Sequence, residues 1–272
     1  MIKLSEISAA AEKYDVAAET IEKDYVISWI LLSLSQSQLL ENFIFYGGTA
    51  IKRIYFEDHR FSEDIDLISS KKFNIYHILN ELTCFKFAKD KINLILEINH
   101  DKTEFHDDRA QFYISYSAYD EIVGAPKEIR LDFAMNRTSF GEKNNKTVIP
   151  SYTDLNNQKS KLSVMTLNTI IANKLGLLID LTRNEPRDLY DIWFLLNRTE
   201  RFNFDMGKMC CAFKDKYGFK PTLNIFEPYL KNENFKKYWE SRLKNQLGTL
   251  PDIEIVTQDI NIMLAEIFGS NI

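Results

Sequence analysis

Residues 45–68 read FYGGTAIKRIYFEDHRFSEDIDLI and end on an Asp-x-Asp pair, Asp64 and Asp66, in a segment that predicts a strand. Alternate residues share one face of a strand, so both carboxylates project together while Ile65 and Leu67 pack inward. Two adjacent negative charges persist most easily with a cation between them, and Mg²⁺ (or Mn²⁺) prefers hard oxygen ligands completed by substrate phosphates. The pair therefore indicates a metal-bound nucleoside triphosphate (NTP), although an exposed strand end explains the same spacing.

Two glycines in the same stretch point to a phosphate. Gly47 and Gly48 follow the apolar segment 43–46, which predicts a strand, and precede 50–56, which predicts a helix. Backbone N–H groups at a helix N-terminus with no Cβ in the way bind phosphate well. Thr49 adds a hydroxyl, which could instead cap the helix. A simple strand–turn–helix corner is the alternative interpretation.

A third carboxylate would complete a metal site. The segment EIRLDFA (128–134) alternates apolar and polar residues, which predicts a strand with Arg130 and Asp132 on its polar face. In a mixed sheet Asp132 could lie beside Asp64 and Asp66. The polar face could equally meet solvent, because the sequence alone does not fix the strand order.

A second group of charged residues lies in NKLGLLIDLTRNEPRDLYDIWFLL (173–196). An apolar helical stripe runs through its second half, comprising Leu189, Ile192, Trp193 and Leu196. Asp188 and Asp191 flank this stripe. Asp188 could simply complement the helix dipole in the first turn, whereas Asp191 lies deeper in the helix. Lys174 stands among apolar residues, where it could reach phosphate in a cleft or snorkel at a helix edge.

The composition describes a packed globular chain of 272 residues, with 45% hydrophobic residues and a net charge of −5. Three cysteines without a C-x-x-C spacing argue against a disulfide framework and a zinc site. The N-terminus lacks an apolar signal region, and no apolar run is long enough to span a bilayer. We therefore expect a soluble cytoplasmic protein without a membrane partner.

The charge is unevenly distributed along the chain. Residues 201–250 carry ten basic and five acidic residues, a net charge of 10 − 5 = +5, with aromatic residues interleaved. A solvated helical surface over an aromatic core explains this pattern. A basic face for RNA explains it as well, while the acidic average argues against tight non-specific binding of nucleic acid.

The hydrophobic periodicity along the sequence predicts three parts. Residues 1–42 read as helices packed on a core, residues 43–150 as an α/β core, and residues 151–272 as a helical domain. The polar stretch 136–160 reads as a loop and a boundary. The fold class expected is α/β (α+β) with a mixed sheet.

Taken together, these segments resemble the AbiEii family of nucleotidyltransferase toxins, the MenT-like toxins of type IV toxin–antitoxin systems. The turn GGT is followed by Arg60, Ser62, Asp64 and Asp66, which is similar to the first motif of that family. IEKDYVISWIL (21–31) resembles its N-terminal helix, and Lys174 with RDLYDIWFLL (187–196) resembles its later motifs. The resemblance extends from about residue 20 to residue 197, so the last 75 residues have no matching motif.

The resemblance implies a polymerase-β-like nucleotidyltransferase core and a set of roles. Catalytic residues would be Asp64, Asp66, Asp132, Lys174 and Asp191, and the first three would hold Mg²⁺ (or Mn²⁺). Nucleotide-binding residues would be Gly47, Gly48, Thr49, Arg60, Ser62, Lys174 and Asp188. A hydroxyl of the acceptor would attack the α-phosphorus of the NTP and release pyrophosphate.

The resemblance also implies biological partners. Family members are toxins of toxin–antitoxin and phage abortive-infection systems, with an AbiEi-like antitoxin that need not contact the toxin. Some relatives act on the 3′ end of tRNA and so stop translation, and the basic segment favours such an RNA acceptor. The same chemistry on a small molecule such as an aminoglycoside, or on a protein, is the alternative. A non-catalytic binding protein is a third reading, against which the intact carboxylates argue.

Overall fold

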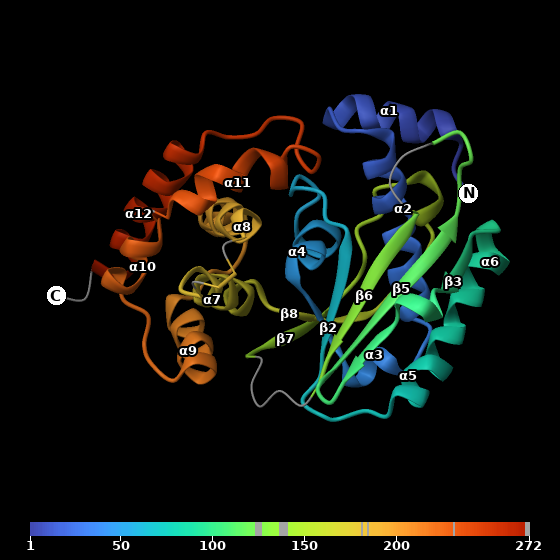
Figure 1. The fold of residues 1–272 in the computed structure, drawn as a ribbon, viewed down its shortest axis with the longest axis horizontal. Helices are drawn as coiled ribbons and strands as arrows, with labels where there is room; N and C mark the ends of the chain where they lie inside the picture. Colours follow the sequence, from blue (N-terminus) through green and yellow to red (C-terminus); the bar gives the residue numbers. More distant parts are fainter. Residues whose placement is uncertain (123–126, 136–140, 181, 184, 231, 270–272) are drawn as a thin grey trace. The chain divides into compact units, whose positions relative to one another are not determined.

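The computed structural model describes all residues except 123–126, 136–140, 181, 184, 231 and 270–272. The chain forms two compact units (Figure 1). We call Met1–Thr138 with Lys143–Met165 the sheet unit, and Ser139–Glu142 with Thr166–Ile272 the helical unit. The division falls at Thr166 and not at residue 151, where the sequence placed it.

The sheet unit contains one mixed sheet of eight strands among the described residues. The strands are β1 (Ile44–Tyr46), β2 (Asp64–Ile68), β3 (Ile95–Ile98), β4 (Glu104–His106), β5 (Arg109–Ser117), β6 (Glu128–Ala134), β7 (Lys143–Lys146) and β8 (Leu162–Met165). Their order is β3-β5-β6-β2-β1-β8-β7, and β4 pairs with β5. Strand β2 therefore lies in the middle of the sheet, parallel to β6 and antiparallel to β1.

Strands β7 and β8 differ from the sequence-based expectation. Strand β7 falls in the stretch 136–160 that was predicted to be a loop, of which 136–140 lie outside the described residues. All four residues of β7 are exposed and polar, so they carry no alternation that would mark a strand. Their pairing with β8, and that of β8 with β1, place residues 151–165 with the sheet rather than with the helices.

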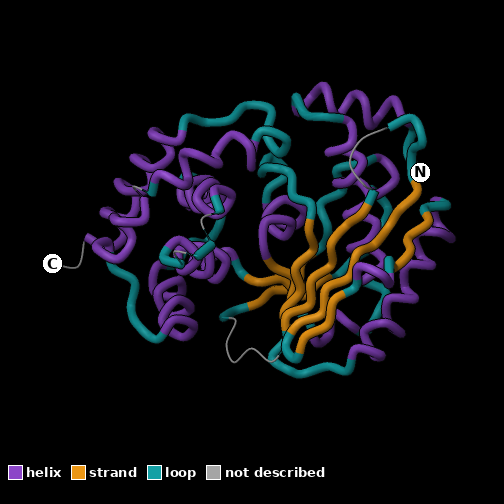
Figure 2. Tube along the Cα trace, viewed as in Figure 1, coloured by secondary structure: helices purple, strands orange, loops and turns teal. Residues whose placement is uncertain are grey.

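Helices cover one face of this sheet (Figure 2). They are α1 (Leu4–Tyr14), α2 (Ala18–Leu34), α3 (Leu39–Asn42), α4 (Gly47–Ala50), α5 (Ile75–Glu81) and α6 (Lys86–Ile92). A π-helical turn, Ile51–Tyr55, continues α4. Helix α2 is buried on nearly every side and shares one hydrophobic core with the inward residues of β2, β5 and β6. The opposite face of β2 and β6 carries the carboxylates.

The helical unit consists of α7 (Leu167–Leu178), α8 (Pro186–Leu196), α9 (Met206–Tyr217), α10 (Leu223–Leu230), α11 (Glu233–Leu243) and α12 (Ile253–Gly269). Local signals set several helix ends. Glu185 caps α8 ahead of Pro186, and Gly218 ends α9 in the left-handed region with a φ of +84°. None of the helices in the described part of the chain combines the length and apolar character that crossing a bilayer requires.

Candidate active site

The central strand β2 presents the Asp-x-Asp pair as its alternation predicts. Ile65 and Leu67 are fully buried in the core, while Asp64 and Asp66 are half-buried on the opposite face. The parallel register of β2 and β6 pairs Asp66 with Asp132. The structure thus supplies the strand order that the sequence left open and brings the third carboxylate beside the first two.

The glycine turn packs directly against these carboxylates and their neighbours. Gly47 has a φ of +86°, and a Cβ built on it would lie 2.5 Å from Oδ2 of Asp66. A Cβ on Gly48 would lie 2.7 Å from Nη2 of Arg60 and 3.2 Å from Oγ of Ser62. A side chain at position 47 would be strained as well as crowded, and one at position 48 would have to push aside the buried Arg60 guanidinium. The two halves of the motif, about fifteen residues apart in sequence, therefore form one compact site.

Thr49 and Arg60 lie inside this site rather than on its surface. The Thr49 hydroxyl donates to the backbone carbonyl of Asp64 and is not a cap for α4. The Arg60 guanidinium is buried beside Gly48 and donates to the carbonyl oxygen of Phe61 at 3.2 Å. The Thr49 hydroxyl thus fastens the glycine turn to β2, and the Arg60 guanidinium packs beside Gly48.

The Glu-Lys-Asp-Tyr segment at 22–25 anchors the same turn from the other side. Asp24 is buried and accepts from Nη1 of Arg53 at 3.0 Å and from the Tyr152 hydroxyl at 2.7 Å. Arg53 belongs to the π-helical turn that continues from Gly47 and Gly48. The family-like helix therefore acts through a buried ion pair that fixes the backbone after the glycines.

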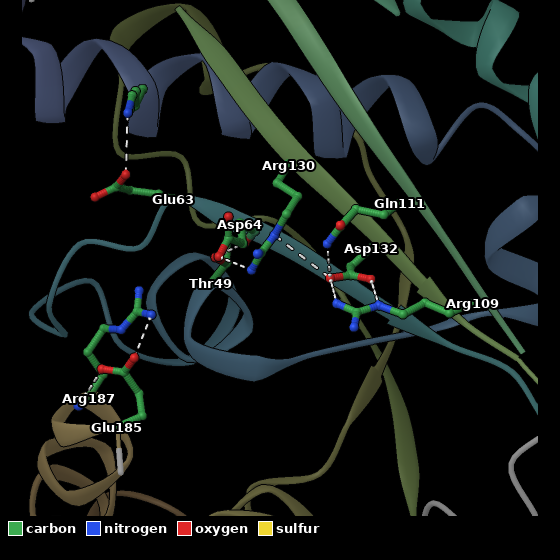
Figure 3. Close-up of polar contacts among 10 residues, drawn as sticks. Thr49, Glu63, Asp64, Arg109, Gln111, Arg130, Asp132, Glu185 and Arg187 are labelled. Atoms are coloured by element: carbon green, nitrogen blue, oxygen red, sulfur yellow. Dashed lines mark hydrogen bonds and ion pairs between the residues drawn. The ribbon is translucent and has the colours of Figure 1, made fainter. Parts of the chain in front are cut away.

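Two arginines and a glutamine donate hydrogen bonds to Asp64 and Asp132 (Figure 3). Arg109 donates from Nε to Oδ1 of Asp132 at 2.6 Å and from Nη2 to Oδ2 at 2.5 Å. Gln111 donates to the same Oδ2 at 3.1 Å, and Arg130 donates to Oδ2 of Asp64 at 2.5 Å. Hydrogen bonding to Asp132 raises the pKa of Arg109, which keeps this guanidinium cationic.

Sequence reasoning missed Arg109 and Gln111 as site residues and assigned no role to Arg130. A signal existed in the alternation of β6, since Arg130 and Asp132 share a face. Arg109 and Gln111 alternate in the same way at the start of β5, and Gln111 pairs with Asp132 across the strands. Finding them required the antiparallel register of β5 and β6.

The donor set suits a divalent cation at Asp64 and Asp66. Both offer half-buried carboxylate oxygens on one strand face, which are the hard ligands that Mg²⁺ and Mn²⁺ prefer. Asp132 lies beside them, but Arg109 engages both of its oxygens. Within the described residues, no three His, Cys, Asp or Glu side chains are arranged to hold a metal ion. The third ligand of the predicted metal set is thus bound to a guanidinium.

In the helical unit, the other predicted residues form a buried ion-pair network. Nζ of Lys174 lies 2.5 Å from Oδ1 of Asp188 and 2.7 Å from Oδ2 of Asp191. Arg183 Nε lies 2.7 Å from the second oxygen of Asp188. Burial raises the pKa of Asp188, but Lys174 and Arg183 outweigh it and hold this pKa below its ordinary value. Lys174 is thus neither at a helix edge nor exposed.

The start of α8 also holds a local ion pair, in which Nη2 of Arg187 lies 3.0 Å from Oε2 of Glu185 (Figure 3). Further along α8, Trp193 is half-buried and its indole donates to Asp259 at 2.9 Å, whereas the other residues of the predicted stripe are buried. The apolar stripe thus packs as expected.

The basic segment of the helical unit is a surface over an aromatic core. Every described basic residue in 201–250 is exposed: Arg201, Lys208, Lys214, Lys216, Lys220, Lys236, Lys237, Arg242 and Lys244. Lys231 lies outside the described residues. Beneath them Phe226, Phe235 and Trp239 are buried. A solvated surface over an aromatic core and a basic face for RNA are both compatible with these helices, because solvent reaches the charges.

Comparison with solved structures places the fold among nucleotidyltransferases. A protein of H. pylori assigned as a nucleotidyltransferase superposes with a TM-score of 0.58 at 20% identity, covering 93% of this chain and 96% of that chain. The MenT4 nucleotidyltransferase toxin of Mycobacterium tuberculosis H37Rv superposes with a TM-score of 0.64 at 15% identity, covering 100% and 91% respectively. A search of curated protein sequences gave no match.

The family model described as "Nucleotidyl transferase AbiEii toxin, Type IV TA system" matches residues 29–265. The match includes the glycine turn, the three carboxylates of the sheet unit and the ion-pair network of the helical unit. Such a system pairs each toxin with an antitoxin, so an antitoxin partner is implied. The chain therefore belongs to the AbiEii family of type IV toxin–antitoxin systems and is a nucleotidyltransferase toxin.

Proposed function

We propose that this chain transfers a nucleoside monophosphate from an NTP to an RNA acceptor, the 3′ end of tRNA, and so blocks translation in the bacterial cytoplasm. The observation that carries the proposal is the contact between the glycine turn and Asp66. A Cβ on Gly47 would lie 2.5 Å from the Asp66 carboxylate, so bare backbone and metal-binding oxygens meet at one point. A triphosphate with its metal requires both in the same place.

Each residue of the sheet unit has a role in this mechanism. Asp64 and Asp66 would hold Mg²⁺ (or Mn²⁺), which when bound stabilises negative charge on the attacking and departing oxygens. Gly47 and Gly48 expose backbone for phosphate to approach, and Thr49, Arg60 and Ser62 hold that backbone in place. The oriented carboxylate of Asp132 accepts the proton of the acceptor hydroxyl. That hydroxyl attacks the α-phosphorus in line, and pyrophosphate leaves.

The family resemblance assigns Lys174 to the triphosphate, and Asp188 and Asp191 to the vicinity of the nucleotide. These roles stay predictions. The buried ion pairs of Lys174 support a second role, in which the three residues fix helices α7 and α8 relative to one another. The two roles differ in their effect on stability, because only the structural role requires Lys174 for folding.

The exposed basic residues of the helical unit support an RNA acceptor. Exposed lysines and arginines on a chain of acidic average charge attract a polyanion, and their contribution weakens as salt rises. An aminoglycoside, a cation, would gain nothing from this surface. An AbiEi-like antitoxin is the proposed partner, and it need not contact the toxin.

The proposal is tested by incubating the protein with total bacterial RNA, Mg²⁺ and each α-³²P-labelled NTP separately. We expect label in a tRNA-sized band with one or more nucleotides, and none with Asp66→Ala. Glu63→Gln is the matched control, since Glu63 is an exposed neighbour of the pair and forms an ion pair with Lys23 at 3.3 Å. Label on an added aminoglycoside or on a protein, with none on RNA, would overturn the RNA acceptor and leave nucleotidyl transfer in place.

A further inference from the structure

A guanidinium stands where the predicted metal set needs a third ligand. Arg109 uses Nε and Nη2 to engage the two oxygens of Asp132 at 2.6 and 2.5 Å, the paired geometry in which arginine binds carboxylate most strongly. Gln111 adds a third donor at 3.1 Å. The side chain of Asp132 is only 9% exposed, so these donors take up most of its accessible surface. A divalent cation that used Asp132 would have to displace Arg109.

The side chain of Arg109 can leave Asp132 without a change in the sheet. Its backbone is held in the ladder opposite Ala134, and the following residues of β5 continue this pairing. Its side chain, in contrast, is 48% exposed. Gln111, buried beside Asp132, would remain to orient the carboxylate. Moving the guanidinium therefore changes rotamers only, and water can solvate it on the way.

The charges of the site favour an exchange of partners. Asp64, Asp66 and Asp132 carry −3, and Arg109 with Arg130 carries +2, which leaves −1. A divalent cation added to this set would meet two guanidinium groups competing for the same oxygens. A metal-bound triphosphate brings new negative charge, so a displaced guanidinium gains an acceptor at the moment it loses one. Arg130 offers a second donor for that negative charge, because within the described residues its buried Nε has no hydrogen-bond acceptor.

We propose that Arg109 is an exchangeable counter-ion of Asp132: it competes with the divalent cation in the nucleotide-free protein and moves onto the triphosphate when the metal-bound nucleotide arrives. This proposal rests on the proposed function for the identity of the ligands. It gives Arg109 a positioning role for Asp132 and a binding role for the nucleotide. It also makes metal binding without nucleotide weak, which keeps the site closed until substrate is present.

The test measures Mn²⁺ binding to the nucleotide-free protein by electron paramagnetic resonance. Arg109→Ala removes the competitor, so we expect its Mn²⁺ affinity to rise roughly tenfold, the effect of about one bidentate ion pair at a partly exposed site. Arg109→Lys keeps the charge and should lie between the two. Lys102→Ala is the matched control: Lys102 pairs with Glu128 at 2.6 Å, also on β6, and is 50% exposed. It should leave Mn²⁺ affinity unchanged.

A second readout separates exchange from simple competition. With Mn²⁺ saturating, the affinity for a non-hydrolysable NTP analogue should fall roughly tenfold in Arg109→Ala, since a charged phosphate contact is lost, and should stay constant in Lys102→Ala. The two affinities thus move in opposite directions in one variant. A thermal melt confirms that the variants are folded, and Arg109→Lys gives a second estimate should the alanine variant melt early.

Several results would overturn the proposal. Mn²⁺ affinity that is equal or lower in Arg109→Ala, or no Mn²⁺ binding by either protein, would show that Arg109 does not compete with the cation. Nucleotide affinity that is unchanged would show that the guanidinium does not move to the triphosphate. Failure of the proposed function looks different, because the RNA labelling gel would then be blank while the Mn²⁺ comparison could still give either answer.

Discussion

The two units each hold a cluster of opposite charges, and the clusters differ in how they meet water. In the sheet unit, the guanidinium groups of Arg109 and Arg130 are 48% and 36% exposed, although the partner of Arg109, Asp132, is only 9% exposed. In the helical unit, Lys174 and Asp191 pair through side chains that are 10% and 0% exposed. The first cluster can exchange partners with solvent or a ligand. In the second cluster the ion pairs are buried, so water cannot compensate a charge that loses one of its partners.

This difference in exposure predicts how much stability the protein loses when each cluster is mutated. An exposed ion pair contributes little to stability, because water and salt replace the lost partner. A buried pair contributes little net but is expensive to break, since the remaining charge has no solvation. Changes in the sheet cluster should therefore appear in activity, and changes in the helical cluster should appear first in folding. The predictions below test this contrast, from the largest expected effect to the smallest.

The largest contrast compares asparagine substitutions in the two clusters. Asp66→Asn removes a metal ligand on a half-buried strand face, so transfer should fall by at least about 10³-fold, or ~4 kcal/mol of barrier, with little change in melting temperature. Asp191→Asn should instead lower the melting temperature. Transfer assays beside thermal melts of both variants measure this. A large fall in stability for Asp66→Asn would remove the contrast.

Lys174→Met tests whether the buried network is structural. The substitution removes the cation that Asp188 and Asp191 share, while Asp188 keeps Arg183, so unfolding free energy should fall by about 3–5 kcal/mol. Denaturant titration of the full chain measures it. Arg109→Met is the matched comparison and should cost less, about 1–2 kcal/mol, because Gln111 and Arg130 remain beside the Asp132 carboxylate. Lost transfer with unchanged stability in Lys174→Met would favour the nucleotide-binding role that the family resemblance assigns.

Two glycines separate backbone strain from contact with the site. Gly47 and Gly218 have φ angles of +86° and +84°, so an alanine at either should cost about 1–2 kcal/mol of stability. The Cβ on Gly47 would press on Asp66, whereas nothing lies within 4 Å of a Cβ on Gly218. We expect Gly47→Ala to lose roughly 100-fold in transfer, about 2.7 kcal/mol of barrier, and Gly218→Ala to keep its activity. Equal activity in the two variants would contradict the close approach.

The smallest expected effect is on the stability of the protein at low pH. The pKa of Asp188 is lower in the folded chain, where Lys174 and Arg183 overcome the cost of burial, than the value of about 3.9 in an unfolded chain. Its stabilisation is thus complete above about pH 3.9 and is lost as pH falls through the lower folded value. Asp188→Asn should flatten the fall in melting temperature below pH 4. Asp215→Asn, which removes an exposed carboxylate of the same unit, is the control and should keep the slope of the unchanged protein.

Much of the architecture followed from local patterns. The strands around Asp64 and Asp132, the buried helix α2 and the helix that begins at Pro186 all carry the period of their element. Strand β7 could not be found this way, because an exposed polar edge strand has no alternating burial. The end of the sheet unit was misplaced because β8 is short and buried at all four residues, so it shows no alternation either.

The site residues also divide into those that a local sequence pattern predicts and those that depend on long-range contacts. The glycines and the Asp-x-Asp pair lie within one stretch, so their proximity could be proposed from the sequence. The partners of Asp132 are Arg109 and Gln111, more than twenty residues away, and their contact depends on the register of β5 against β6. The burial of Lys174 depends on helix packing, which its apolar neighbours suggested without revealing the two aspartates as its partners.

The Asp24–Arg53 link gives the most recognisable segment of the chain an unexpected meaning. Asp24, Arg53 and Tyr152 form a buried joint beneath the glycine turn. Selection for fold alone would maintain that joint, whereas selection for toxicity would maintain Asp64 and Asp66. A relative that keeps the first and lacks the second should be a folded pseudoenzyme. Comparing the segment of Asp24 with the segment of Asp64 and Asp66 would therefore separate active toxins from relatives that have lost catalysis.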